Sequence, residues 1–193
     1  MINQQENKEF FINLCKTHIK RDGLDALLAW LEKSDFYTAP ASAKYHLAEP
    51  GGLVQHSINV FNQLVRLSKC YEDQLKISNE QLVITALFHD LCKVNFYKPD
   101  TRNVKVDGVW QTVPAYSYEE KFAYGGHGSK SVFLIERFMK LTPEEAVAIN
   151  CHMASWDGNK DVGNAYEHFP SAWLLHVADE AATFLDENER VEK

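Results

Sequence analysis

A histidine and an aspartate stand side by side, as His89 and Asp90, within an otherwise apolar stretch of the chain. Residues 82–93 read LVITALFHDLCK, and helical spacing there directs both polar side chains toward an apolar face. Burial of a carboxylate is unfavourable unless it meets a proton, a cation or a metal ion. This doublet is therefore the strongest sign of chemistry in the sequence.

Four further potential ligands occupy comparable inward positions in other predicted helical segments or, for His127, just before one: His56, His127, His152 and Asp179. Four imidazoles and two carboxylates suit a first-row transition ion, namely Mn, Fe, Co, Ni or Zn, rather than Mg or Ca, whose sites are dominated by oxygen. Six ligands exceed the three or four of a single catalytic zinc ion, whereas two ions that share one carboxylate would use all six. Taken alone, each histidine has the alternative of being a hydrogen-bonded core residue.

The composition is that of an ordinary soluble globular protein. The chain has 193 residues, of which 45% are hydrophobic and 24% charged, enough for one domain with a sizeable core. No apolar run approaches the ~20 residues that span a bilayer, and the first residues do not form a signal peptide. Four cysteines without Cys-x-x-Cys spacing predict buried, reduced thiols and a cytoplasmic location.

The net charge of −7 argues against stable binding to duplex nucleic acid, but it leaves room for a small anionic substrate in a local positive pocket. Part of this charge lies in residues 186–193, which we interpret as a solvated helix end.

Most of the sequence predicts helix, in segments at about 6–20, 22–33, 51–71, 78–93, 129–140, 142–152 and from 170 onward. Asp22, Ser78 and Thr142 are the predicted caps of three of these helices. Residues 94–120 differ, because alternating residues around Asp107-Gly108 predict a β-hairpin. We expect one all-α domain over residues 1–193, a helical bundle with a small β-hairpin inserted at about 94–120.

The ordered set of ligands resembles the HD superfamily, which is named for its His-Asp doublet, and in particular its six-ligand variant that holds two metal ions. Residues 39–56, APASAKYHLAEPGGLVQH, are similar to the segment that leads into HD domains attached to bacterial 3′–5′ exoribonucleases. Residues 175–179, LHVAD, are similar to the far end of such domains. The resemblance covers roughly residues 36–187.

The resemblance implies a metal-dependent phosphohydrolase with two divalent transition-metal ions. The first ion would be held by His56, His89, Asp90 and Asp179. Asp90 would bridge to a second ion, held also by His127 and His152, and a hydroxide between the ions would be the nucleophile. Lys93 occupies the lysine position of the family's His-Asp-x-x-Lys pattern and is expected to contact phosphate, so Asp90 and Lys93 are the expected catalytic residues.

The implied substrate is a nucleotide or a related small phosphoester, and no membrane partner is expected. Further substrate contacts are predicted at His46, Lys98, Arg102, Trp156 and Asp157. For the cations of the hairpin, the alternative is a solvated ribbon without a role in binding. His176, one helical turn before Asp179, is expected to support the ligands or to pack in the core.

Other readings stay open. The chain lacks the Glu-Asp pair that follows the doublet in alarmone hydrolases and the Gly-Tyr-Pro signature of cyclic-di-GMP phosphodiesterases. No nucleic-acid-binding domain precedes residue 36, which argues against a processive exonuclease. The alternatives are a di-iron oxygenase, since inositol oxygenase uses the same ligand order, and a non-catalytic regulatory module that binds metal or nucleotide. The sequence also leaves open a homo-oligomer, and either phosphomonoesters or phosphodiesters as substrates.

Overall fold

The computed structural model describes residues 2–121, 123–157, 160 and 162–187. These residues form a mostly helical fold with one antiparallel hairpin, which confirms the predicted fold class. The helices are α1 (Gln4–His18), α2 (Leu24–Glu32), α3 (Gly52–Cys70), α4 (Asn79–Phe88), α5 (His127–Glu136), α6 (Pro143–Cys151), α7 (Val162–His168) and α8 (Pro170–Ala181). Short turns of other helix types are η1 (Leu91–Lys93), η2 (Ala154–Asp157) and the π-helical η3 (Ala182–Asp186).

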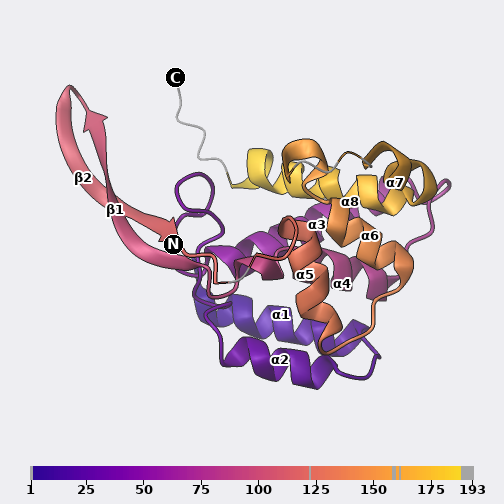
Figure 1. Ribbon diagram of the computed structural model, residues 1–193. Coiled ribbons are helices and arrows are strands. Elements are labelled where there is room, and N and C mark those ends of the chain that lie inside the picture. The colour runs from indigo at the N-terminus through magenta and orange to yellow at the C-terminus, as the bar shows by residue number, and fades with distance from the viewer. Residues whose placement is uncertain (1, 122, 158–159, 161, 188–193) are drawn as a thin grey trace.

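Helices α3 and α4 form the middle of the fold. Helix α3 packs on α4 and α8, helix α6 packs on α5 and α8, and α1 lies against α3 and α4. In Figure 1, α1 and α2 lie on one side of this centre, and α7 and α8 lie on the other. The ring of Phe88, the last residue of α4, stacks edge-on against Phe11 of α1 with centroids 5.7 Å apart. This aromatic contact fixes the end of α4, where the His-Asp doublet begins.

The cap of α4 agrees with the sequence, but its end does not. The Ser78 hydroxyl accepts a hydrogen bond from the Gln81 backbone N–H at 3.1 Å, as predicted. The helix ends at Phe88 rather than near residue 93, and His89 is its C-cap. The chain then turns through η1, so that residues 89–93 leave the helix axis beside the core.

The predicted cap of α2 at Asp22 is wrong. The N-cap is Gly23, whose φ of 92° lies in the left-handed region that favours glycine. A Cβ at this position would stand 1.9 Å from the carbonyl oxygen of Phe138, so the chain passes against the segment that follows α5. Close approach of the two backbones, rather than a side-chain cap, therefore sets the start of α2.

The inserted hairpin confirms the turn predicted at Asp107 and Gly108. Strands β1 (Tyr97–Val106) and β2 (Val109–Tyr118) pair in antiparallel register, and both turn residues have positive φ, 51° and 84°. Such a turn matches the right-handed twist of the flanking strands. The ribbon extends away from the helices (Figure 1), and its base is attached by the hydrogen bond from the Tyr116 backbone N–H to the carbonyl of Ala43.

Three of the four cysteines are buried, as expected, whereas Cys70 at the end of α3 is exposed. None of them forms a disulfide. Within the described part of the chain, no helix has both the length and the apolar character needed to cross a bilayer. Helix α7, seven residues long, was not predicted, since it is short and carries no clear apolar stripe.

We expect Gly128→Ala to destabilise the fold by about 1–3 kcal/mol, the usual cost of forcing an extra methyl group into a packed interior. A Cβ at Gly128 would lie 2.3 Å from the backbone oxygen of Asn150, where α5 packs on α6. The matched control is Gly163→Ala in α7, where a Cβ meets nothing within 4 Å. Urea unfolding of the two variants is the measurement, and equal stability would contradict the packing described.

Candidate metal centre

The doublet lies at the buried end of α4. His89 and Asp90 are 0% and 2% exposed. The Nδ1 atom of His89 donates to the backbone oxygen of Ala86 at 2.8 Å, three residues earlier in its own helix. His152 repeats this arrangement as the C-cap of α6, where its Nδ1 donates to the oxygen of Ile149 at 2.6 Å. Because Nδ1 carries the proton in both rings, each Nε2 has a lone pair directed away from its helix.

His56 reaches the same place from the middle of α3. Its Nε2 lies 3.1 Å from Oδ1 of Asp179 and 3.3 Å from Nε2 of His89. Its Nδ1 faces the carboxylate of Glu187 at 2.9 Å, so each ring nitrogen of His56 lies beside a carboxylate. Three Nε2 atoms from three helices therefore point into one buried region.

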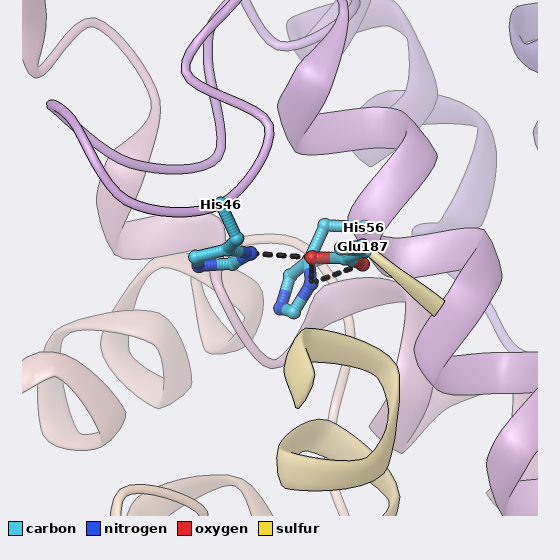
Figure 2. A group of neighbouring side chains, drawn as sticks. All are labelled: His46, His56 and Glu187. Atoms are coloured by element: carbon cyan, nitrogen blue, oxygen red, sulfur yellow. Dashed lines mark hydrogen bonds and ion pairs between the residues drawn. The ribbon is translucent and has the colours of Figure 1, made fainter. Parts of the chain in front are cut away.

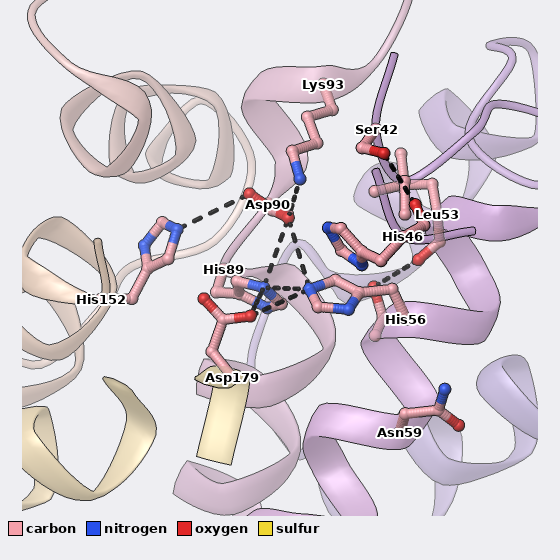
Figure 3. A network of polar contacts seen from close by, with 12 residues as sticks. Ser42, His46, Leu53, His56, Asn59, His89, Asp90, Lys93, His152 and Asp179 are labelled. Carbon is pink, nitrogen blue, oxygen red and sulfur yellow. Dashed lines mark hydrogen bonds and ion pairs between the residues drawn. The ribbon is translucent and has the colours of Figure 1, made fainter. Parts of the chain in front are cut away.

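Asp90 lies at the centre of this region (Figure 3). Its Oδ2 is 3.4 Å from Nε2 of His89 and 3.7 Å from Nε2 of His56, while its Oδ1 is 3.6 Å from Nε2 of His152. The ammonium of Lys93 contacts Oδ2 at 2.7 Å. The two oxygens of Asp90 thus face different histidines, which is the arrangement that a carboxylate shared between two ions requires.

The ionisable side chains of the site shift one another's pKa values. Burial alone raises the pKa of Asp90, but the Lys93 ammonium and His89 outweigh it and hold that pKa well below its ordinary value. The pKa of Asp179 is lowered in the same way, since its hydrogen bond and charge interaction with His56 overcome burial. For His56, burial favours the neutral ring, yet the Glu187 and Asp179 carboxylates raise its pKa to about 10. Without a metal ion, a proton on His56 offsets part of the negative charge of the carboxylates, and a bound cation would take its place.

The donor set fits a transition-metal ion. The Nε2 atom of His152 is buried and has no hydrogen-bond partner, although an unsatisfied buried polar atom is costly. Two ligands that bind one ion at ~2.1 Å lie about 3.0–3.4 Å apart at tetrahedral or octahedral angles. The separations of 3.1–3.9 Å between the His56 and His89 Nε2 atoms and the oxygens of the two aspartates are close to this range.

Ligand atoms of His, Cys, Asp and Glu converge in three groups among the described residues. They are His56 with His89 and Asp179, His89 with Asp90 and His152, and His46 with His56 and Glu187. Five of the six sequence-predicted ligands are in the first two groups. The sixth, His127, is the exposed first residue of α5 and is in none of them. It lines a cavity of about 110 Å³ together with Lys93, and its role as a ligand stays a prediction.

The predicted substrate-binding residues are more widely separated than the predicted metal ligands. His46 packs edge-on against His56, with ring centroids 4.7 Å apart, so it lies at the site. Lys98 pairs with Glu119 at the base of the hairpin, Arg102 is exposed farther along the hairpin, and Trp156 is 80% exposed in η2. The side chain of Asp157 lies outside the described residues. The structure does not bring Arg102 or Trp156 to the metal ligands, and their binding roles stay predictions.

His176 lies directly behind one of the ligands. Its Nδ1 donates to the backbone oxygen of His152 at 2.8 Å, and its ring stacks at 6.3 Å on Tyr166. The contact is to the backbone of a predicted ligand, and either a supporting role or core packing stays a prediction for His176.

Glu187 was not predicted from the sequence as part of the site. The expectation of a solvated tail from residue 186 is wrong at this residue, because its side chain is fully buried. In a continuous α-helix, residue 187 would point about 80° away from Asp179. The π-helical turn η3 changes the direction in which residue 187 points, and such turns often occur at functional sites. No pattern in the sequence marks the π turn, so the prediction could not place the carboxylate.

The family model described as HD domain matches residues 53–186, more than half of the 193 residues. The chain belongs to the HD domain family. No curated protein and no solved structure matches the chain. HD domains bind metal ions and are generally metal-dependent phosphohydrolases, and the buried His/Asp groups fit a metal site of this kind. Helices α1 and α2 precede the matched segment, yet Phe11 and Leu27 belong to the same buried core as the HD domain.

We expect chelator-treated protein to be stabilised by Mn²⁺ or Co²⁺, because an ion binds the folded ligand set and not the unfolded chain. An ion at about 100 times its Kd should raise the free energy of unfolding by about 2.7 kcal/mol. His89→Ala should remove this gain. The control His168→Ala alters an exposed ring that is hydrogen-bonded to the Asn164 carbonyl and belongs to none of the ligand groups among the described residues, and it should keep the gain. Denaturant unfolding with and without the ion is the measurement, and equal gains in both variants would contradict the site.

Proposed function

We propose that this HD domain is a metal-dependent phosphohydrolase that acts on a nucleotide or a related small phosphoester. The observation that carries the proposal is the convergence of three imidazole Nε2 atoms on the buried carboxylate of Asp90 and the half-buried carboxylate of Asp179. The first ion would be held by four ligands: His56, His89, Asp90 and Asp179. A second would use Asp90 and His152, with His127 as the predicted third ligand.

The charge of the site supports a cationic cofactor and an anionic substrate. Asp90, Asp179 and Glu187 are held ionised, and the ammonium of Lys93 contacts Asp90. With His56 neutral, as it would be with an ion on its Nε2, these four residues carry two net negative charges. One divalent ion neutralises this charge. A second divalent ion would leave an excess of positive charge, which a phosphate dianion would balance.

Bound divalent ions supply Lewis acidity, which lowers the pKa of water and neutralises charge that develops on a phosphoryl oxygen. In this chain, Asp90 presents one oxygen to each side of the site and is our proposed bridge. Lys93 has three N–H donors, one of which Asp90 accepts, so the ammonium retains donors for a phosphoryl oxygen. Its half-buried position at the edge of the 110 Å³ cavity supports this role.

Aromatic rings beside this cavity support a nucleotide as substrate. Phe96 lines the cavity, and Tyr118 stacks on Phe96 with centroids 5.4 Å apart and ring planes 9° apart. Tyr118 is 70% exposed, so its outer face is accessible. Aromatic faces of this kind stack on nucleobases with little preference for sequence.

Metal-loaded protein should release phosphate or a nucleoside from members of a panel of nucleotides and aryl phosphomonoesters and phosphodiesters. Asp90→Asn should lower kcat/KM by about 10²–10³-fold or more, the loss typical of removing one preorganised electrostatic group at a reacting centre. Asp73→Asn is the matched control, because it makes the same chemical change at an exposed position between α3 and α4. Steady-state kinetics with Mn²⁺ or Co²⁺ is the measurement.

Full activity in Asp90→Asn would contradict the proposed chemistry. Substrate-dependent O₂ uptake by iron-loaded protein, without phosphoester hydrolysis, would instead favour a di-iron oxygenase. Tight metal binding without turnover of any substrate would favour a regulatory module.

A further inference from the structure

One of the three histidines at the site cannot be oriented by its own helix. His89 and His152 stand at helix ends and donate Nδ1–H to a carbonyl three residues earlier. His56 lies inside α3, where backbone carbonyls already accept the hydrogen bonds of the helix. Its nearest upstream carbonyl, that of Leu53, also accepts from the Ser57 hydroxyl at 3.0 Å. His56 therefore needs an acceptor from another part of the chain.

Glu187 supplies that acceptor. Its two carboxylate oxygens lie 2.9 Å and 3.1 Å from Nδ1 of His56 (Figure 2). The same carboxylate contacts Nδ1 of His46 and accepts from the Asn59 side-chain amide at 2.9 Å. With its side chain fully buried, Glu187 is surrounded by donors on three sides, which compensates for its desolvation.

A special backbone turn brings Glu187 to this position. The π-helical turn η3 follows α8, and the backbone N–H of Glu187 donates to the carbonyl of Ala182 at 3.1 Å. The preceding residue, Asp186, accepts a hydrogen bond from the Gln63 side chain at 2.7 Å and so attaches the turn to α3. Asp186 and Glu187 both attach this turn to α3, Asp186 through Gln63 and Glu187 through His56. Substitution of Asp186 is therefore a matched control for substitution of Glu187.

We propose that Glu187 is a positioning residue of the metal centre, which holds His56 so that its Nε2 is directed to the metal ion. This proposal rests on the metal centre of the proposed function. A carboxylate that accepts a hydrogen bond from a metal-binding imidazole fixes the tautomer and the orientation of the ring. It also makes the ring a stronger electron-pair donor to the metal ion. His46 and Asn59 hold Glu187 in turn, so His46 acts here through Glu187 rather than through substrate.

The test is calorimetric titration of the full chain, after treatment with a chelator, with Co²⁺ alone. Glu187→Gln keeps the size of the side chain and removes its charge, and it should weaken binding about 10–100-fold, as is typical for loss of such a partner. Asp186→Asn should bind Co²⁺ as the wild type does. Asn59→Ala removes one donor to Glu187 and should give a smaller loss than Glu187→Gln.

A second measurement separates orientation from folding. In ¹H–¹⁵N spectra of the metal-loaded protein, the Nδ1 proton of His56 should exchange slowly in the wild type and in Asp186→Asn. It should exchange rapidly in Glu187→Ala, which has no acceptor at this position. Far-UV circular dichroism of each variant checks that it is folded, and a loss of Co²⁺ affinity in folded Asn59→Ala supports the proposal even where a Glu187 variant does not fold.

Equal Co²⁺ affinity in wild type and Glu187→Gln would overturn the proposal, whatever their activities. An equal loss of affinity in Glu187→Gln and Asp186→Asn would also overturn it, because the turn as a whole would then be responsible. Failure of the metal-loaded wild type to hydrolyse phosphoesters would contradict only the proposed function.

Discussion

The site depends on the burial of one carboxylate, that of Asp90, which is almost fully removed from water. Asp90 follows the last turn of α4, and its charge is compensated by Lys93 and by imidazoles from α3, α4 and α6. Any loosening of those helices would leave a buried charge without partners, which is more costly than the loss of an exposed ion pair. The packing of α3 on α4, and of α6 on α8, therefore stabilises the fold and assembles the ligands at the same time.

The three imidazoles reach this carboxylate by two different routes. Where a helix ends, its last free carbonyl orients the ring, as for His89 and His152. Where the helix continues, a distant carboxylate does so, as Glu187 does for His56. In each case, an acceptor lies at Nδ1 and Nε2 is directed to the centre of the site. This common orientation is what distinguishes the set from ordinary buried histidines, which need no shared orientation.

The sequence predicted what local periodicity and turn chemistry determine. The doublet, the inward faces of α3 and α8, and the hairpin turn at Asp107 all follow from residue spacing and residue type. The sequence did not predict the end of α4 at Phe88, the close approach at Gly23 or the π turn before Glu187, because these depend on contacts between distant segments. The exposed position of His127 also depends on how α5 packs on α6 rather than on any pattern within α5.

We propose that a transition-metal ion binds between the carboxylates of Asp90 and Asp179 and the Nε2 atoms of His56 and His89. Anomalous diffraction from crystals of the Mn- or Co-loaded protein tests it most directly. We expect an anomalous peak at this position, within bonding distance of both aspartates. A peak bound elsewhere on the chain, with these four side chains unchanged and unligated, would contradict it.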